Sequence, residues 1–581
     1  MVDIWQVGNT GVRNPLRIQA GLKVYAESNL IGQIRGVHGA VSFMKLLCEK
    51  GILNNESGKD VTGSYGRKWR LVFNLNGFTY PDVEQEYGFS QKELGSVDKI
   101  TPFGDTFLQA DTLSAIQECF LRAMSVKMTQ IKDDAYFSPL CWTLAVLLKI
   151  EEKTGNSDVS FLEFAVCIQT TNPSFDITTV VSNILKIRQR KADCTAKKKF
   201  DRQIYEEISQ DYARKSENFK EYGDMNLRYL RASGIFQRKG RGIAIVPEKR
   251  ALAIQLATNL ISKVPLLERY KALCSGPSLP TDDLALAKAV LDDLIKQLDT
   301  RHIKYDISGL SLDTAIAINN TRRNLEEKLS QFNELRYAEN QRKQWKEIYD
   351  YMELIMKRGG TKHYDDDTEI VVPKEEAAAY FEWVIWRAFL AIDHLTNKAY
   401  EVRRFSVDQD FYPVNTAPGN GPDLIAEFDD CVVVVEVTLS ENSRQEAMEG
   451  EPVRRHVADL IQRYDKPVYG LFIANRIDSN TAETFRIGVW YTQEDKRLEL
   501  HIIPFTLAQF STVFKSIFTT QNAAPQAIIH LMDECEQHRK NCESPEWKKI
   551  IAKIIQTKTT TNGQQNNGIK NEPLSMTFTL D

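Results

Sequence analysis

Apolar residues at helical spacing dominate the first 360 residues of this chain. Three short apolar segments, Val41–Cys48, Cys141–Ile150 and Phe161–Thr170, have the length and composition of buried helices. Between residues 276 and 360 the chain becomes more charged, and apolar residues recur every three or four positions. They are Leu325, Leu329, Phe332 and Leu335, followed by Trp345, Ile348, Met352 and Ile355. This pattern predicts a spacer of antiparallel helices.

Two segments within the helical region predict strands with basic ends. After a helix expected to end at Gly234, the sequence QRKGRGIAIVPEKR predicts a strand, a basic turn at Lys239–Gly242 and a second strand. Earlier, GSYGRKWRLVFNLNGF predicts a glycine-bounded strand with basic residues at its base, and Thr101-Pro102 predicts a capped helix start. We therefore expect two winged-helix-like subdomains, over residues 1–135 and 136–275.

Strands and helices alternate in the last third of the chain. A helix is expected over residues 373–396, and strands at Asp423–Phe428 and Cys431–Leu439. Then follow a helix at Val453–Arg463, a strand at Pro467–Ala474, a helix at Asn480–Phe485 and a strand at Leu498–Phe505. The sequence predicts a multidomain α+β protein, with a mainly helical region over 1–275, a helical linker over 276–360 and a mixed α/β core over 361–556. Residues 557–581 are polar and of low complexity, and we expect them to be disordered.

Two acidic residues are expected to face each other in the first hairpin of this core. Asp429-Asp430 is a plausible two-residue turn, and pairing the strands about it places Phe428 opposite Cys431 and Asp423 opposite Glu436. Directly opposed residues have Cβ atoms roughly 4.5–5.5 Å apart, so two carboxylates there repel each other unless a cation lies between them. Mg²⁺, which prefers oxygen ligands, is the simplest such cation. The alternative is a surface hairpin whose acids are solvated.

A third carboxylate is predicted on an apolar helix face. Glu382 shares a stripe with Ile385, Trp386, Phe389 and Ile392. Because an unpaired charge is costly in apolar surroundings, Glu382 needs a partner. One explanation is a buried ion pair with Arg403 or Arg404, and the other is a carboxylate delivered to the same cation site.

Composition and cysteine usage indicate a cytoplasmic protein. No apolar run approaches the ~18–20 residues that a membrane span requires, and the first ten residues lack the basic and apolar regions of a secretion signal. The nine cysteines are scattered without a C-x-x-C motif, which suits a reducing compartment. We expect no contact with a membrane.

Positive charge is concentrated locally, although the net charge is −4. Residues 186–202 contain eight basic residues against Asp193 and Asp201, and residues 227–250 contain seven against Glu248. Proteins that bind nucleic acid need local positive surface to contact phosphates, whereas basic residues at a strand edge can also serve only solubility. The candidate DNA-binding residues are Lys186, Arg188, Arg190, Lys191, Arg228, Arg231, Arg238, Lys239 and Arg241.

Three short strings carry a resemblance to a known family. G-N-G-P-D at 419–423, E-V-T at 436–438 and E-G-E-P-V-R-R-H at 449–456 resemble the catalytic segment of the AlwI family of type IIS restriction endonucleases and their nicking relatives. The first two also resemble the PD-(D/E)xK nuclease motif, with Thr438 in place of its lysine. In addition, L-R-Y-L-R-A-S-G-I-F at 227–236 and V-P-E-K at 246–249 resemble the family's recognition region, and F-E-W at 381–383 its equivalent helical segment.

The resemblance implies a function and a set of site residues. Asp423, Glu436 and Glu449 match metal-binding acids, the carbonyl of Val437 matches a backbone ligand, and Glu382 would be a fourth catalytic acid. The implied protein is a prokaryotic, Mg²⁺-dependent type II site-specific deoxyribonuclease with a PD-(D/E)xK core. It would recognise a short asymmetric sequence in double-stranded DNA and cut a few base pairs outside it, and a cognate DNA methyltransferase would protect the host.

Two alternatives to this function remain. One is a strand-specific nicking endonuclease or the large subunit of a heterodimeric restriction enzyme, in which a transient homodimer or a small subunit would supply the second cut. The other is a DNA-binding regulator that does not cleave.

Overall fold

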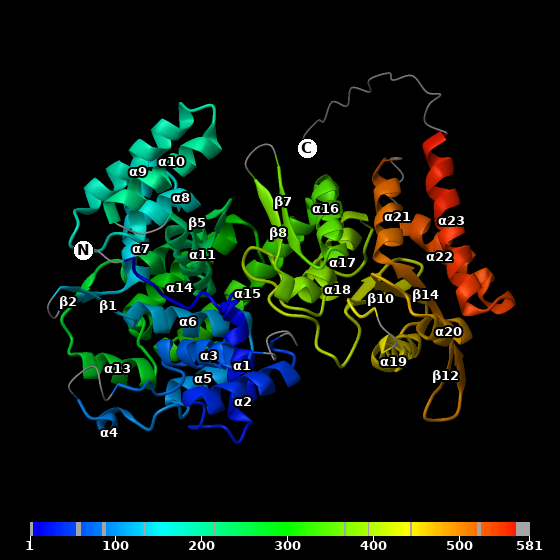
Figure 1. The fold of residues 1–581 in the computed structure, drawn as a ribbon, viewed down its shortest axis with the longest axis horizontal. Coiled ribbons are helices and arrows are strands. Elements are labelled where there is room, and N and C mark those ends of the chain that lie inside the picture. Colours follow the sequence, from blue (N-terminus) through cyan, green and yellow to red (C-terminus); the bar gives the residue numbers. More distant parts are fainter. Residues whose placement is uncertain are drawn as a thin grey trace. The chain divides into compact units, whose positions relative to one another are not determined.

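The chain folds into two compact units, each with many helices and small sheets (Figure 1). The N-terminal unit comprises Met1–Phe332 with Asp365–Thr368 and Asp408–Asp410, and the C-terminal unit comprises Asn333–Tyr364, Glu369–Val407 and Phe411–Asp581. The computed structural model describes residues 4–53, 60–83, 89–132, 135–212, 216–364, 368–392, 394–441, 444–519 and 525–564. In this described part, no helix is both long and apolar enough to cross a membrane.

The first part of the N-terminal unit is built from helices. They are α1 (Ile18–Ala26), α2 (Gly36–Glu49), α3 (Ser64–Leu75), α4 (Gln91–Leu94), α5 (Pro102–Gln109) and α6 (Leu113–Val126). The predicted helix start is confirmed, because the Thr101 hydroxyl accepts a hydrogen bond from the Gly104 N–H at 2.8 Å. The strand predicted after Gly63 is wrong. That segment forms α3, whose buried residues Trp69, Val72 and Phe73 lie at helical spacing.

The second part of this unit contains the predicted basic hairpin. Helix α7 (Pro139–Thr154), strand β3 (Asp158–Val159), α8 (Phe161–Glu163) with the π-helical η3 (Phe164–Ile168), and α9 (Ile177–Ala192) come first. Then α10 (Lys197–Tyr212) and α11 (Ser216–Ala232) lead to β4 (Phe236–Lys239) and β5 (Gly242–Ile245). The three strands form an antiparallel sheet in the order β3-β5-β4. Gly240 adopts a φ of 57° in the two-residue turn, a conformation that glycine adopts without strain.

The remaining elements of the N-terminal unit include the predicted helical spacer. A small sheet joins β1 (Thr129–Lys132), β2 (Ala135–Phe137) and β6 (Ile261–Ser262), and α12 (Arg250–Leu256) and α13 (Leu266–Ser275) lie nearby in sequence. Helices α14 (Leu284–Thr300) and α15 (Ala315–Glu339) share a buried cluster that includes Leu291, Leu294, Leu325 and Leu329. Leu325 and Leu329 of the first apolar repeat therefore pack helix against helix, whereas Ile348, Met352 and Ile355 of the second repeat pack into the core of the C-terminal unit and not into a separate spacer.

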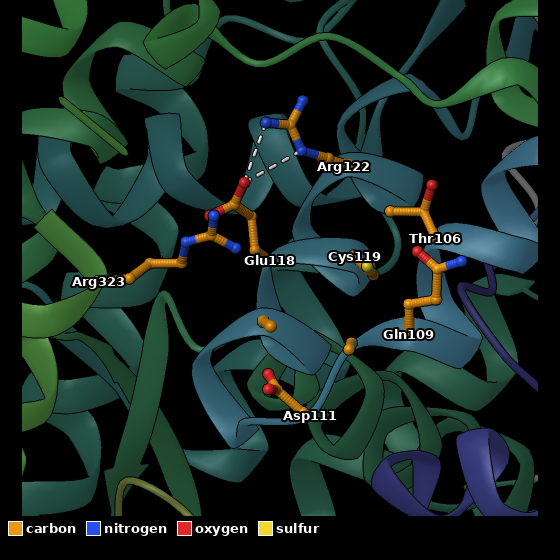
Figure 2. Close-up of a pocket in the computed structure, with 9 residues that line it drawn as sticks. Thr106, Gln109, Asp111, Glu118, Cys119, Arg122 and Arg323 are labelled. Carbon is orange, nitrogen blue, oxygen red and sulfur yellow. Dashed lines mark hydrogen bonds and ion pairs between the residues drawn. The ribbon is translucent and has the colours of Figure 1, made fainter. Parts of the chain in front are cut away.

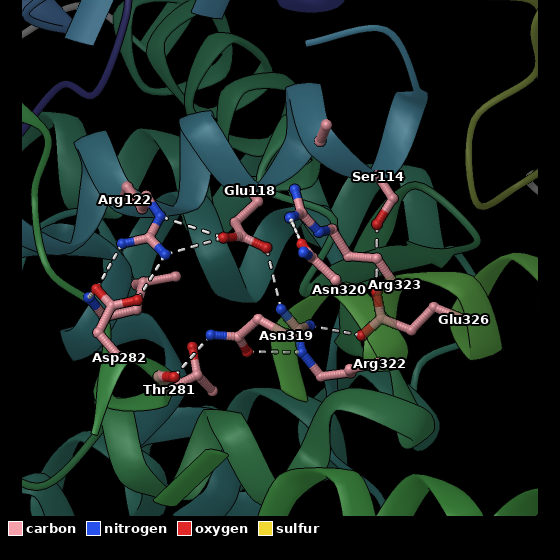
Figure 3. A network of polar contacts seen from close by, with 12 residues as sticks. Ser114, Glu118, Arg122, Thr281, Asp282, Asn319, Asn320, Arg322, Arg323 and Glu326 are labelled. Atoms are coloured by element: carbon pink, nitrogen blue, oxygen red, sulfur yellow. Dashed lines mark hydrogen bonds and ion pairs between the residues drawn. The ribbon is translucent and has the colours of Figure 1, made fainter. Parts of the chain in front are cut away.

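The part of α15 that belongs to the N-terminal unit, up to Phe332, is held by a network of ion pairs that runs from the buried Arg322 to the exposed Asp282 (Figure 3). The Glu118 carboxylate on α6 accepts from Arg122 at 2.9 Å and from Arg322 at 3.0 Å. Arg322, whose side chain is 4% exposed, also donates to Glu326 at 2.7 Å, and Arg122 donates to Asp282 at 2.6 Å. One carboxylate thus connects arginines of two helices.

A four-stranded sheet forms the centre of the C-terminal unit. Its order is β14-β11-β10-β9, from β9 (Leu424–Glu427), β10 (Val432–Thr438), β11 (Val468–Ala474) and β14 (His501–Thr506). Strands β9 and β10 are antiparallel and the other pairs are parallel. Helix α17 (Ala377–Ile392) covers one face of the sheet and α19 (Glu451–Ile461) the other (Figure 1). Because both faces are covered, Val432–Val435 are fully buried.

Other elements surround this sheet. They are α16 (Trp345–Met356), the hairpin β7 (Gly360–His363) and β8 (Glu369–Val372), α18 (Ala399–Val402), α20 (Ser479–Ile487), β12 (Val489–Tyr491), β13 (Arg497–Glu499), α21 (Leu507–Thr519), α22 (Pro525–Gln537) and α23 (Ser544–Gln564). Where one strand was predicted over 498–505, the chain forms β13 and β14. Helix α23 continues through residues 557–564, where a polar disordered tail was predicted, and Thr557 and Thr559 donate to carbonyls one turn earlier. Residues 565–581 lie outside the described part.

Candidate active site

The register of the acidic hairpin is the one that the sequence predicts. Val432 pairs with Glu427, Val434 with Ile425, and Val435 with Leu424, and the Phe428 N–H donates to the Cys431 carbonyl at 2.9 Å. The next step of this register brings Asp423 beside Glu436. The carboxylate of Asp423 accepts a hydrogen bond from the Val437 N–H at 2.8 Å, so the two strands bring both acids to the same end of the sheet.

The loop before Asp423 is held by Arg404. Its guanidinium donates to the carbonyls of Pro418 and Pro422 at 3.3 and 3.2 Å and to the Asn420 side chain at 2.6 Å. Gly421 lies directly against this guanidinium, and a Cβ there would collide with it, whereas a Cβ at Gly419 would meet nothing within 4 Å. The glycine at 421 therefore permits the arginine to fix the backbone that leads into the acid.

Glu436 is the last buried residue of β10, before the partly exposed end of the strand, and contacts a histidine from α19. The Nδ1 atom of His456 lies 2.6 Å from Glu436 Oε1, and both residues are buried. Val453, His456, Val457 and Leu460 form the buried side of α19, so the histidine reaches the acid from the helix that packs on the sheet. Sequence reasoning missed this residue, although its helical spacing with apolar neighbours was visible.

Glu382 comes from the other helix. It is 5% exposed on α17, and its carboxylate accepts from the Ala417 N–H at 2.6 Å. The proposed ion pair with Arg403 or Arg404 is not formed: Arg403 makes a two-bond ion pair with Glu334 at 2.7 Å, and Arg404 binds the loop described above. Asp423 and Glu436 both act electrostatically on Glu382, which places the helix carboxylate near the hairpin acids.

Glu449 completes the set. It lies in the π-helical turn η8 (Glu446–Gly450) that leads into α19, and it is hydrogen-bonded to the side chain of Thr438 at the end of β10. Thr438 occupies the position of the lysine in the broader nuclease motif. Its hydroxyl here contacts an acid and accepts from the Ser440 N–H at 3.1 Å.

Burial raises the pKa of all four acids, and the charge of a neighbouring acid adds to this for Asp423, Glu436 and Glu382. Burial raises the pKa of Glu436 to about 8, with the charge of Glu449 as the next cause. Burial, and then Glu436, hold the pKa of Asp423 well above its usual range, and burial, and then Asp423, do the same for Glu382. Burial also raises the pKa of Glu449. Burial and the nearby Arg455 lower the pKa of His456, so its imidazole is neutral at pH 7.

The four acids are near enough to act on one another electrostatically, but each has a hydrogen-bond partner of its own. Within the described residues, no three His, Cys, Asp or Glu side chains converge in a way that could hold a metal ion. Each acid instead contacts a group of its own: Val437 N–H, Ala417 N–H, His456 and Thr438. The donor set is nevertheless of the kind that a divalent cation takes, because four carboxylates with raised pKa values lie around one end of the sheet, and a cation bound there would reduce the repulsion between them. In addition, His456 Nε2 is buried and has no hydrogen-bond partner among the described residues.

The candidate DNA-binding residues lie in the N-terminal unit and divide by exposure. Lys186 and Arg190 on α9, and Lys239 and Arg241 at the β4–β5 turn, are exposed. The Arg190 guanidinium lies 3.7 Å from Glu207, at an exposed pair that constrains it little.

The other candidates are engaged inside the same unit. Arg188 donates to Glu163 with two hydrogen bonds near 3 Å, and Lys191 lies 2.7 Å from Asp201. Arg228 lies 2.8 Å from Asp224. Burial and the nearby Arg238 lower the pKa of Arg231 to about 10, opposed by Asp410, and the backbone N–H of Arg238 donates to Asp410. The side-chain contacts thus give Arg188, Lys191 and Arg228 a role in holding the unit together.

A pocket in the N-terminal unit does not contain any of the predicted site residues (Figure 2). Thr106, Gln109, Asp111, Glu118, Arg122 and Arg323 contribute to its lining. Glu118 and Arg122 are paired with each other and belong to the network that holds α15. This pocket is therefore a feature of the packing between helices.

Comparisons with known proteins identify the family of the chain. The sequence profile described as AlwI restriction endonuclease matches residues 77–513, more than half of the chain. No curated protein matches the sequence. One solved structure is similar to part of the chain: the small subunit, R.BspD6I2, of the heterodimeric restriction endonuclease R.BspD6I. The two sequences are 20% identical, and the match covers 37% of this chain and 98% of that chain, with a TM-score of 0.29.

The family match defines the class of protein: a restriction endonuclease, that is, a site-specific deoxyribonuclease that acts on DNA. More specifically, the chain belongs to the AlwI restriction endonuclease family.

Proposed function

We propose that the chain is a type IIS restriction endonuclease whose C-terminal unit cuts DNA a few base pairs outside a short asymmetric sequence bound by the N-terminal unit. The observation that carries this proposal is the acid pair at the end of the β9–β10 hairpin. Asp423 and Glu436 lie next to each other in the strand register, and two further acids act on them. The acids belong to one unit and the exposed basic turn to the other, which suits cutting at a distance from recognition.

Asp423, Glu436, Glu449 and the carbonyl of Val437 would hold the divalent cation, Mg²⁺ by its preference for carboxylate oxygen. A bound Mg²⁺ stabilises charge on the scissile phosphate and lowers the pKa of the attacking water. The chain's own residues set the geometry. Val437 N–H orients Asp423, and the neutral imidazole of His456 orients Glu436.

Glu382 is the acid left to position the attacking water, since the other three acids would hold the cation and no lysine occupies position 438. Its pKa is held well above the usual range of a carboxyl by burial, and then by Asp423, which favours proton uptake from the water. Glu382 is anchored by the Ala417 N–H at one oxygen, so its other oxygen is available for the water.

The exposed basic residues would contact DNA phosphates. Lys186, Arg190, Lys239 and Arg241 can reach a ligand without breaking a buried ion pair. Arg188, Lys191, Arg228, Arg231 and Arg238 would support the DNA-binding surface through their internal contacts.

A second candidate function is strand-specific nicking. The chain carries one cluster of four acids in the described part of its C-terminal unit, and one hydrolytic site cuts one strand at a time. Cutting both strands would need a second site from a transient homodimer or from a small-subunit partner. A cognate DNA methyltransferase would protect the host's own sites in either case.

One digestion experiment tests these proposals. Supercoiled plasmid is incubated with the protein and Mg²⁺, followed over time on a gel, and the ends are sequenced. We expect ends at a fixed offset outside one recurring sequence, with linear product for duplex cleavage and open circles alone for nicking. Ends inside the recurring sequence, ends at random positions, or equal cutting in EDTA would contradict the proposal.

A further inference from the structure

Helix α9 presents an exposed face with a composition unlike that of its neighbours. Thr178, Ser182, Asn183, Lys186, Gln189 and Arg190 are all exposed. At about 100° per residue they fall within an arc of roughly 140°. Val180, Val181 and Ile184 on the opposite side are buried. The helix is therefore fixed by its apolar side, and one continuous polar strip faces solvent.

This strip carries no acid. Helix α9 has no Asp or Glu between Ile177 and Ala192, and acids occur only at its two ends, Asp176 and Asp193. The neighbouring α10 instead places exposed Glu206 and Glu207 among its basic residues, as solvated helices usually do. A surface that meets a polyanion must avoid like charge, and the residues of the α9 strip satisfy that requirement, with Glu207 of α10 beside Arg190 at one end.

Three polar side chains of the strip make no hydrogen bond to another described residue. Among the described residues, the side chains of Asn183, Lys186 and Gln189 have no intramolecular hydrogen-bond partner. By contrast, the Thr179 hydroxyl donates to the capping Asp176 carboxylate at 2.8 Å, and the Ser182 hydroxyl donates to the Thr178 carbonyl at 2.8 Å. Asn183, Lys186 and Gln189 therefore remain available to a ligand.

The spacing of these three residues lets each reach a different base pair. They stand three positions apart, which corresponds to a rise of about 4.5 Å per step along the helix, somewhat more than the roughly 3.4 Å rise per base pair of DNA. An α-helix fits the major groove, where Asn and Gln pair with adenine through two hydrogen bonds and Lys donates to guanine. The 16 residues of α9 are long enough, at about 24 Å, to lie along the groove.

We propose that α9 is a base-reading helix, in which Asn183, Lys186 and Gln189 contact base edges in the major groove of the recognised sequence. Arg190 contacts a phosphate beside the groove. This inference rests on the proposed function, because it assigns sequence recognition to one face of one helix in the N-terminal unit.

The test measures binding, so that it does not depend on cleavage. The Asp423→Asn chain, in EDTA, selects bound molecules from a pool of duplex DNA with a randomised segment, and the bound fraction is sequenced. The same selection is run with Asn183→Ala, Lys186→Met and Gln189→Ala added singly. Matched controls are Gln203→Ala, an exposed amide on α10 that donates to Glu207, and Lys296→Met, an exposed lysine on α14.

We expect each of the three variants to keep most of the selected sequence and to lose discrimination at one position, on the order of 10-fold to 100-fold. The controls should select the unchanged sequence. The inference is overturned if all three variants select the unchanged sequence, or if they weaken binding equally at every sequence. If the Asp423→Asn chain selects no sequence at all, the proposed recognition function of the N-terminal unit fails as well. Melting curves identify any variant that is misfolded, and Asn183→Asp then repeats the test at the same position.

Discussion

The imidazole Nδ1 of His456 lies 2.6 Å from Oε1 of Glu436, and both side chains are buried. This contact fixes one of the two hairpin acids from a helix that lies on the face of the sheet. The second nitrogen, Nε2, has no hydrogen-bond partner among the described residues. Neighbours that orient a metal ligand usually affect metal affinity and activity by about 10-fold to 100-fold.

Removing the contact between His456 and Glu436 should increase the Mg²⁺ concentration that cleavage requires, without weakening DNA binding. We expect His456→Ala to raise the Mg²⁺ concentration needed for half-maximal cleavage by about 10-fold or more, because Glu436 loses its orienting partner. His456→Asn, which can place an N–H near the position of Nδ1, should recover part of the loss. The control is Gln462→Ala, an exposed residue of the same helix region. An unchanged Mg²⁺ requirement in His456→Ala would exclude the positioning role.

The acid cluster should make stability depend on pH when no cation is present. Burial raises the pKa of Glu436 from 4.5 to about 8 in the folded chain, so the folded state holds a proton that the unfolded state releases in this range. The contribution of Glu436 to the free energy of unfolding in EDTA is therefore greatest below pH 4.5, and it falls as the pH rises towards about 8. Asp423 and Glu382 act in the same direction.

Melting curves between pH 5 and pH 8 in EDTA check this dependence. Glu436→Gln, which is neutral at every pH, should make the melting temperature depend less on pH. Mg²⁺ should raise the melting temperature of the wild-type chain near pH 8, because it binds the folded state. The interpretation fails if the wild-type chain and Glu436→Gln lose stability in parallel over this range.

Two glycines of the same loop should differ in their tolerance of a methyl group. At Gly421 a Cβ would collide with the Arg404 guanidinium, which must then give up its hydrogen bonds to Pro418, Asn420 and Pro422. We expect Gly421→Ala to lower the cleavage rate by about 10-fold, because these bonds hold the backbone that leads into Asp423. Gly419→Ala meets nothing within 4 Å and should cut at the wild-type rate. Equal rates for the two variants would show that Arg404 does not position the loop.

Removing Arg322 from the ion-pair network of the N-terminal unit should destabilise the protein much more than removing its neighbour Arg323. Arg322 is the shared partner of Glu118 and Glu326, and its side chain is 4% exposed. Arg322→Ala removes the buried arginine that both half-buried carboxylates share and should lower the free energy of unfolding by about 2 kcal/mol. Arg323→Ala removes a contact only to the exposed Asn320 and should cost less than about 1 kcal/mol. Urea unfolding of the two variants measures the difference, and similar costs would contradict the assigned role.

The sequence predicted the hairpin register because two adjacent acids in the turn and uninterrupted apolar strands leave one way to bury the strands. The basic hairpin after Gly234 was predictable for a similar reason, since glycine and basic residues mark its turn. In contrast, α3 was assigned as a strand because the glycines at its ends outweighed the helical spacing of Trp69, Val72 and Phe73.

The site residues that sequence reasoning missed depend on tertiary packing. His456 reaches Glu436 only because α19 crosses the sheet, and the partners of Arg188 and Arg403 are 25 and 69 residues away in the chain. Local sequence also cannot tell a basic residue that binds a neighbour from one that is free to bind DNA. That distinction required the positions of the acids around them.

The most direct test of the central claim is cleavage of supercoiled plasmid in Mg²⁺ by Asp423→Asn and Glu436→Gln, with Asp429→Asn, an exposed acid of the same hairpin turn, as the control. We predict that the first two variants cut at least about 1000-fold more slowly than the wild-type chain and bind the recognised DNA with unchanged affinity in EDTA, while Asp429→Asn cuts normally. Cleavage by either of the first two variants at the wild-type rate would contradict the account of this hairpin as the catalytic site.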